Sequence, residues 1–303
     1  MYKPGYLGLL KNGELENRVI RFKSMLESCV LCPHQCRVNR TKGERGYCKT
    51  LDKAVVSGAQ VHFGEERELV GKYGSGTIFF SHCNLACVFC QNYQISQCGA
   101  GREVTAAELA DMMINLQNKK CHNINLVSPG HIVPQIVEAV FLAAGNGLTI
   151  PVVYNTNGYD LTDTLVLLEG IVDIYMPDIK FADDLTAQKY LGVKKYYSTA
   201  GNAVKEMHRQ VGDLKTDELN TAYRGLLVRH LVMPGNIAGT EKIMRFIAGE
   251  ISKETYVNIM AQYYPAHRAY GFEKLKRKIT KREFSRAVQA AAEAGLNNIR
   301  AFD

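Results

Sequence analysis

Three cysteines, Cys83, Cys87 and Cys90, are the residues of this chain with the most specific chemistry. They have C-x3-C-x2-C spacing within the segment Ser-His-Cys-Asn-Leu-Ala-Cys-Val-Phe-Cys-Gln-Asn-Tyr at 81–93. Three thiolates without a fourth would leave one iron of a four-iron cluster open to a non-protein ligand. Structural zinc sites normally close with four ligands, so zinc or simple buried thiols are the weaker alternatives. The spacing therefore predicts a catalytic [4Fe-4S] cluster whose open iron binds a cofactor.

A second set of cysteines lies nearer the N-terminus, in C-x2-C-x3-C-x11-C spacing: Cys29, Cys32, Cys36 and Cys48. Four thiolates can enclose one zinc ion or ligate one iron–sulfur cluster completely. The segment has too little apolar sequence for a core of its own, so a metal would cross-link it. We expect a second metal centre here, zinc or iron–sulfur, with unligated cysteines as the alternative.

Composition limits the class of protein. The chain has 303 residues and 46% hydrophobic content, enough for one large α/β domain with a small appendage. Nine cysteines in metal-like clusters argue against a disulfide framework and for a reducing, cytoplasmic location. No signal-peptide pattern starts the chain, and no apolar run is long enough to span a bilayer. We therefore expect no membrane association.

Charge is mildly basic, with a formal net charge of +7. Basic residues concentrate near the C-terminus: Lys274, Lys276, Arg277, Lys278, Lys281, Arg282 and Arg286. Such a segment could attract nucleic acid or an acidic partner. The chain has no tryptophan and the segment has too few aromatic residues for base stacking, so nucleic-acid binding is not expected.

From residue 76 onward, apolar runs alternate with amphipathic stretches, as in repeated βα units around a parallel sheet. Strands are predicted at 77–80, 123–127, 150–154, 172–176, 225–232 and 256–260, and a last one at 298–302. Helices are predicted at 105–116, 134–144, 162–168 and 280–295; Thr105 with Glu108 and Thr280 with Glu283 form capping boxes at the first and last of these. The segment 181–223 is long, helical and polar, and is interpreted as a loop insertion over the active face rather than a separate domain. The prediction is an α/β partial (β/α)6 TIM-like barrel at 61–303 with a C-terminal helix, and a cysteine-rich N-terminal extension at 1–60.

Polar residues collect where the predicted strands end, which is where loops build the active site of a parallel barrel. They include Ser-Pro-Gly-His at 128–131, Asn-Thr-Asn-Gly at 155–158, Met-Pro-Asp-Ile-Lys at 176–180, and Gln262. Arg229 and His230 are neighbours in the fifth strand, so one of them should face the barrel interior. The inward residue is a candidate for substrate contact.

The cysteine loop resembles the radical S-adenosylmethionine (SAM) enzymes, whose cluster motif is C-x3-C-x-aromatic-C. Cys83, Cys87, Phe89 and Cys90 match this motif. The resemblance covers residues 76–265 and implies that SAM binds the open iron and is reductively cleaved to a 5'-deoxyadenosyl radical. The continuation Gln-Asn-Tyr-Gln-Ile-Ser at 91–96 is similar to the branch of the pyruvate formate-lyase activating enzyme, including its uncharacterised members.

This resemblance implies SAM-binding roles for Phe89, Ser128, Asn155, Asn157, Asp178, Lys180 and Gln262. Asp178 and Lys180 would flank the SAM carboxylate or ribose, and Asn155, Thr156, Met176 and Asp178 would enclose a monovalent cation. The chain departs from the family in three places. It lacks the acid of the Gly-Gly-Glu-like motif near Ser128, has Asn155 where the activating enzyme has aspartate, and has Gln262 or Tyr263 in place of a SAM-contacting histidine.

The function implied is an enzyme that abstracts hydrogen from an unknown substrate, using electrons from a reductant such as flavodoxin or ferredoxin. Glycyl-radical activation of a protein partner is one candidate, and modification of a small molecule or RNA is another. A non-catalytic iron–sulfur electron carrier is the alternative from a different class. That carrier would need full cysteine ligation of every cluster and would have no affinity for SAM.

Overall fold

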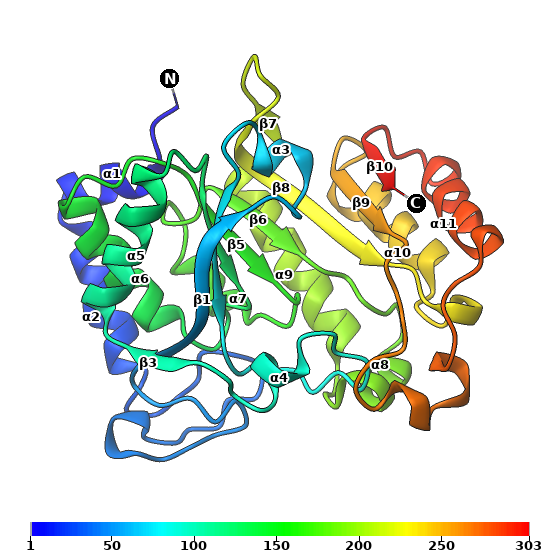
Figure 1. The fold of residues 1–303 in the computed structure, drawn as a ribbon, viewed down its shortest axis with the longest axis horizontal. Coiled ribbons are helices and arrows are strands. Elements are labelled where there is room, and N and C mark those ends of the chain that lie inside the picture. The colour runs from blue at the N-terminus through cyan, green and yellow to red at the C-terminus, as the bar shows by residue number, and fades with distance from the viewer. Residues whose placement is uncertain (1, 303) are drawn as a thin grey trace.

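The computed structural model describes residues 2–302 and has one ten-stranded sheet with helices around it (Figure 1). The strands are β1 Ala54–His62, β2 Ser75–Phe80, β3 Arg102–Val104, β4 Ile124–Val127, β5 Val152–Thr156, β6 Ile174–Pro177, β7 Lys215–Thr216, β8 Ala222–Leu231, β9 Tyr256–Met260 and β10 Ile299–Phe302. The α-helices are α1 Gly5–Lys11, α2 Glu14–Ser24, α3 Arg67–Val70, α4 Tyr93–Ser96, α5 Ala106–Asn118, α6 Val133–Gly145, α7 Thr162–Val166, α8 Asp184–Leu191, α9 Tyr196–Val211, α10 Thr240–Phe246 and α11 Lys281–Glu293.

The sheet is open and mostly parallel, in the order β10-β9-β8-β6-β5-β4-β2-β1-β3, with β7 paired to β8. Strands β2, β4, β5, β6, β8, β9 and β10 run parallel, whereas β1 is antiparallel to both β2 and β3. The six predicted barrel strands and the terminal strand are all present. The fold class of a partial TIM-like barrel is therefore confirmed.

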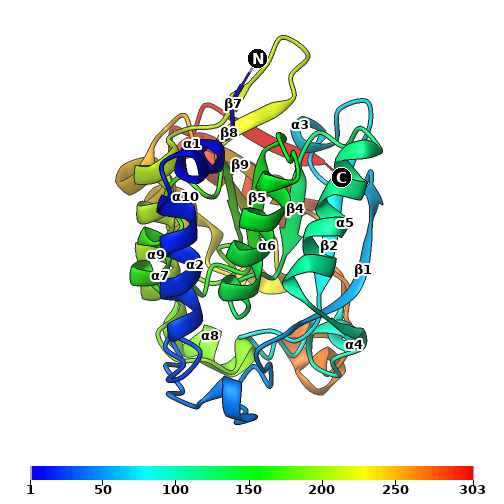
Figure 2. The same ribbon diagram turned by 90° about the vertical axis from the view of Figure 1, so that its left-hand side faces the viewer.

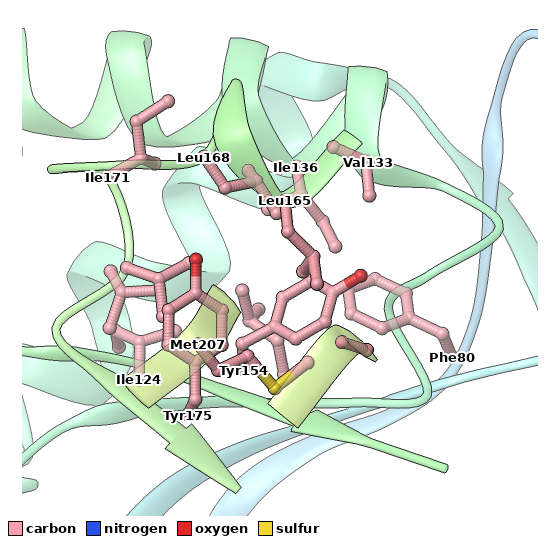
Figure 3. Packing of buried hydrophobic residues seen from close by; sticks show 14 of the residues in the cluster. Phe80, Ile124, Val133, Ile136, Tyr154, Leu165, Leu168, Ile171, Tyr175 and Met207 are labelled. Carbon is pink, nitrogen blue, oxygen red and sulfur yellow. The ribbon is translucent and has the colours of Figure 1, made fainter. Parts of the chain in front are cut away.

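Strand alternation separates an apolar face that packs against the helices from the barrel interior. Ile124, Tyr154 and Tyr175 point toward the helices and pack with Leu165 and Ile136 in the main core (Figure 3). The next residue along each of these strands points the other way. This alternation turns Asn125 and Asn155 inward, so the interior contains these polar groups beside a separate apolar cluster that includes Val153, Ile174 and Met176.

Both predicted capping boxes are present. The Thr105 hydroxyl accepts from the backbone N–H of Glu108, whose carboxylate accepts from the Thr105 N–H, and Thr280 and Glu283 repeat the arrangement at α11. Each box satisfies two N–H groups that would otherwise lack an intrahelical partner.

The prediction for 181–223 is wrong for its second half. Helix α9 packs against α7, β6 and β8, so it is the crossover helix of a βα unit and not a loop insertion. Its buried Ala200, Ala203, Val204, Met207 and Val211 recur at helical spacing within a polar sequence. The first half, with α8, does lie at the end of the barrel that carries the cysteine loop (Figure 1).

The N-terminal segment begins with two helices that pack on the barrel. α1 and α2 lie against α6, and Tyr6, Leu15 and Phe22 are buried in the same core as the barrel helices (Figure 2). β1 continues through residue 60 into the sheet. The chain between α2 and β1 contains the four N-terminal cysteines and lies at the same end as α4 and α8 in both views. The division at residue 60 stays a prediction.

Among residues 2–302, no helix combines the length and apolar character needed to cross a bilayer.

Candidate functional site

The cysteine loop leaves the C-terminal end of β2 and is anchored by backbone hydrogen bonds on two sides. His82, with a positive φ of 68°, donates its N–H to the carbonyl of Ile95 at 3.0 Å. Ala86 and Val88 donate to the carbonyls of Leu191 and Tyr190, each at 2.9 Å, which ties the loop to α8. Cys83, Cys87 and Cys90 are thus presented by one short, anchored segment, all three partly exposed.

Two of the three sulfurs already have hydrogen-bond partners. The Leu85 N–H lies 3.4 Å from Cys83 Sγ and the Asn157 amide 3.3 Å from it. Cys90 Sγ is 3.1 Å from the Ser96 hydroxyl. Burial raises the pKa of Cys83 to about 11, and the Leu85 N–H and the Asn157 amide oppose the rise because they favour the thiolate. Asn157, expected to contact SAM, also reaches the cysteine loop itself.

Lys180 lies between a carboxylate and the cysteine loop. Its ammonium pairs with Asp178, and its charge acts on Cys87 and Cys83. Burial raises the pKa of Cys87, and Lys180 is the largest influence opposing that rise. Although burial acts in the other direction, Asp178 keeps the pKa of Lys180 above its usual value. A positive charge is therefore held next to the thiols, where it would favour their ionised, metal-binding form.

Arg229, not His230, faces the barrel interior. Its Nε donates to Asp178 at 2.9 Å and its Nη2 to Asn155 Oδ1 at 2.7 Å. His230 is fully buried on the opposite side of β8, between the Ile179 carbonyl and the Thr240 hydroxyl. Arg229 is thus the inward residue that the sequence could not distinguish from its neighbour.

The oxygens expected around a monovalent cation have other partners. Asn155 and Asp178 accept hydrogen bonds from Arg229, and the Thr156 hydroxyl donates to Asp160. Met176 packs among buried apolar residues at the barrel floor. The guanidinium supplies the positive charge at this position, so the structure argues against the cation that we expected.

Glu65 is a site residue that the sequence reasoning missed. It enters the barrel from the loop between β1 and α3, and its carboxylate lies 3.6 Å from Arg229 Nη1. Burial raises its pKa to about 7, although Arg229 opposes the rise. The adjacent Glu66 accepts from Asn258 of β9 at 2.8 Å. Two adjacent acids after an apolar strand were the only signal, and no motif marks them as interior residues.

Three of the other expected SAM contacts lie in different surroundings. Phe89 is 6% exposed and packs edge-on between Phe181 and Tyr263. Ser128 has a positive φ of 61° and its N–H donates to the Asn155 carbonyl. Gln262 is exposed on the segment after β9, and its carbonyl accepts from Gln91 of the cysteine loop at 3.2 Å. Their roles in SAM binding stay predictions.

His131, one of the polar residues after the second predicted strand, is enclosed by protein. Its Nε2 lies 2.9 Å from the carbonyl of Ser81, and burial lowers its pKa to about 3. A neutral histidine packed against the cysteine loop supports that loop and does not face an open substrate space.

The four N-terminal cysteines line one small cavity of about 10 Å³. Burial raises the pKa of Cys32 to about 12, and the charges of Cys48, Cys29 and Cys36 add to the rise. Within residues 2–302, no three cysteine, histidine or acidic side chains already stand at the positions of a closed single-ion site. The argument that each cysteine set binds a metal therefore depends on the thiol ligands, on their spacing in the sequence and on their location in one loop or around one cavity.

Comparison with known proteins gives the family. The family model described as Radical SAM superfamily matches residues 77–247, more than half of the chain. The uncharacterized protein MJ0674 of Methanocaldococcus jannaschii is 32% identical over 301 residues, which cover 97% of this chain and 82% of that protein.

Solved structures with a related arrangement include TYW1 with a lysine-pyruvate adduct bound (TM-score 0.46, 12% identity, 78% of this chain and 83% of that chain). Methylornithine synthase (PylB) has a TM-score of 0.45 and 17% identity over 72% of this chain and 68% of that one. The anSMEcpe structure with bound AdoMet and a Cp18Cys peptide has a TM-score of 0.47 and 11% identity, over 73% and 60%. On the family match and the extent of identity to MJ0674, the chain belongs to the radical SAM superfamily.

Proposed function

We propose that Cys83, Cys87 and Cys90 ligate a [4Fe-4S] cluster that binds SAM at its open iron. Membership of the superfamily supports SAM cleavage at an iron–sulfur cluster. The observation that carries the assignment of residues is the anchored loop after β2, which presents the three thiols together and places Cys83 and Cys87 within reach of the Lys180 charge. When bound, the cluster supplies the electron that cleaves SAM and so generates a 5'-deoxyadenosyl radical.

The neighbouring residues would bind and orient SAM. The Lys180 ammonium is suited to the SAM carboxylate, with Asp178 holding it in place. The Asn157 amide bridges Cys83 Sγ and the Asn84 side chain, 2.7 Å away, so it can fix the loop on one side of the cofactor. Orientation matters because hydrogen abstraction needs the 5' carbon in contact with the target bond.

The substrate would approach the polar interior below this site. Arg229, Glu65 and Asn155 line that interior and favour a substrate with polar or charged groups. We propose that the enzyme belongs to the branch of the pyruvate formate-lyase activating enzyme and abstracts hydrogen from a glycine of a protein partner. The support is the sequence continuation at 91–96. The polar interior also favours a second candidate, a small charged molecule.

Reconstitution with iron and sulfide under anaerobic conditions tests the SAM chemistry. With a low-potential reductant and SAM, the protein should release 5'-deoxyadenosine, and Cys87→Ala should not. Cys98→Ala is the matched control, because Cys98 is an exposed cysteine outside both sets. Equal product from Cys87→Ala and the parent would overturn the assignment.

Isotope transfer tests the branch. The enzyme is incubated with macromolecules from cells grown on α-deuterated glycine, and 5'-deoxyadenosine is analysed by mass spectrometry. Deuterium in the product supports a glycyl target. A parallel incubation uses the small-molecule fraction of the same cells. Deuterium that appears in 5'-deoxyadenosine only in this second incubation would refute the glycyl proposal and favour the second candidate.

A further inference from the structure

Arg40 is a buried cation without a carboxylate partner. It is 2% exposed, and its Nε and Nη2 donate to the Leu51 carbonyl at 2.9 and 2.6 Å. Its Nη1 donates to the His131 carbonyl at 2.9 Å and lies 3.8 Å from Cys29 Sγ. Among residues 2–302, none of its partners is an acid. A guanidinium stays charged at any physiological pH, and an uncompensated buried charge is costly. An anion is therefore expected next to it.

The cavity beside Arg40 offers thiols and no acid. Its lining contains all four N-terminal cysteines and no aspartate or glutamate. One backbone donor already points at a sulfur, since the Tyr47 N–H lies 3.4 Å from Cys36 Sγ. Four thiolates around one zinc ion, or around one [4Fe-4S] cluster in its oxidised state, both leave a net negative charge. Ionised cysteines are thus the anion that this site can supply.

We propose that Cys29, Cys32, Cys36 and Cys48 hold a second metal centre, separate from the SAM cluster, and that the buried Arg40 neutralises part of its charge. Four protein ligands leave no open coordination position, which is typical of a structural metal site. Zinc and an iron–sulfur cluster share this ligand chemistry, and metal analysis distinguishes them.

The centre lies directly against the SAM-cluster loop. The His34 ring, two residues after Cys32, stacks on Tyr47 with ring centroids 3.7 Å apart. His34 Nε2 is 2.9 Å from the carbonyl of Asn84, the residue after Cys83. Tyr47 precedes Cys48, so both members of the stack are fixed by the proposed ligands. The centre would position this stack under the loop that carries Cys83 and Cys87.

Metal analysis of a triple variant, Cys83→Ala with Cys87→Ala and Cys90→Ala, tests the centre independently of SAM cleavage. After anaerobic purification and reconstitution, the variant should retain about one zinc or about four irons per chain. Either result supports the proposal and identifies the metal. A folded variant with neither metal would overturn it, whatever the parent does with SAM.

The reciprocal variant is Cys32→Ser with Cys48→Ser. It should lose the N-terminal metal and keep the four irons of the other set, whereas the control Cys98→Ser should keep all metal. Retention of full metal content by the double variant would overturn the ligand assignment. Because loss of two ligands can unfold the segment, substitution of Arg40 provides a second, milder test.

Arg40→Gln removes the positive charge. Arg40→Lys keeps the charge but loses the guanidinium, whose Nε and Nη2 both donate to the Leu51 carbonyl. If Arg40 acts through charge, the apparent affinity for the N-terminal metal in chelator competition should fall about ten- to a hundredfold in Arg40→Gln and much less in Arg40→Lys. Arg37→Gln, at an exposed position in the same segment, should match the parent. Equal losses in Arg40→Gln and Arg40→Lys would overturn the role in charge compensation.

Discussion

Replacing Lys180 with methionine should weaken SAM binding without removing the cluster. Methionine keeps much of the apolar length of the side chain and removes only the ammonium. Asp178 would keep its hydrogen bond with Arg229 Nε at 2.9 Å, so the strand end does not gain an unpaired buried carboxylate. The three thiols belong to a different loop, which Lys180 influences only through its charge. We therefore expect Lys180→Met to retain four irons at the site formed by Cys83, Cys87 and Cys90.

The size of the effect follows from the surroundings of the ammonium. Its side chain is 17% exposed, so a contact with the SAM carboxylate would be largely shielded from water. A charge-assisted hydrogen bond in such a place contributes about 1.5–3 kcal/mol, or about ten- to a hundredfold in affinity. Because SAM must share the ammonium with Asp178, the lower end of this range is expected.

Equilibrium dialysis of SAM against the oxidised, reconstituted protein measures the affinity without cleavage. Lys189→Met is the matched control, because Lys189 is an exposed lysine of nearby α8. Iron content is measured on the same samples. If Lys180→Met binds SAM as tightly as the parent at equal iron content, Lys180 does not contact the cofactor.

Two further predictions concern the barrel wall. Arg229→Met should lower the free energy of unfolding by about 3–5 kcal/mol, because it leaves Asp178 and Glu65 partly unpaired in the interior. Urea unfolding under anaerobic conditions measures this loss. The control Arg209→Met, which removes a surface ion pair, should cost less than about 1 kcal/mol. Burial lowers the pKa of His230 from 6.5 to about 4, so the folded protein favours the neutral ring. The resulting stabilisation is fully present above pH 6.5 and is lost as the pH falls toward 4. Its size is at most about 3 kcal/mol. The stability of the parent relative to His230→Gln should fall over this range, and a pH-independent difference would contradict the reasoning.

The sequence predicted the elements whose determinants are local. Both capping boxes involve residues three apart, and each buried parallel strand reads as a short apolar run. α9 was misinterpreted because its apolar stripe is diluted by polar residues, which include the exposed Lys205 and Arg209 and the buried Glu206. The segment was predicted to be helical, and its apolar period of three and four residues was the available signal that this helix packs on the core.

The site was predictable only where a motif or a strand end marks it. The cysteines, Asn157, Asp178 and Lys180 meet at one end of the barrel because the C-terminal ends of parallel strands share an edge. The inward direction of Arg229 depends on the strand register, which adjacent polar residues do not reveal. Glu65 reaches the interior from a loop preceding the barrel, so its partner lies more than 160 positions away.

The packing of α1 and α2 on α6 has a consequence for synthesis on the ribosome. Both helices and the N-terminal cysteines are synthesised before α6, which packs on the two helices and follows them by roughly a hundred residues. At the usual pace of translation this interval is on the order of ten seconds. During that time α1 and α2 lack their packing partner α6, and the thiols that follow them would be open to metal ions and oxidants. Acquisition of the correct metal at Cys29 and its neighbours would then depend on cellular supply during elongation as much as on the finished fold.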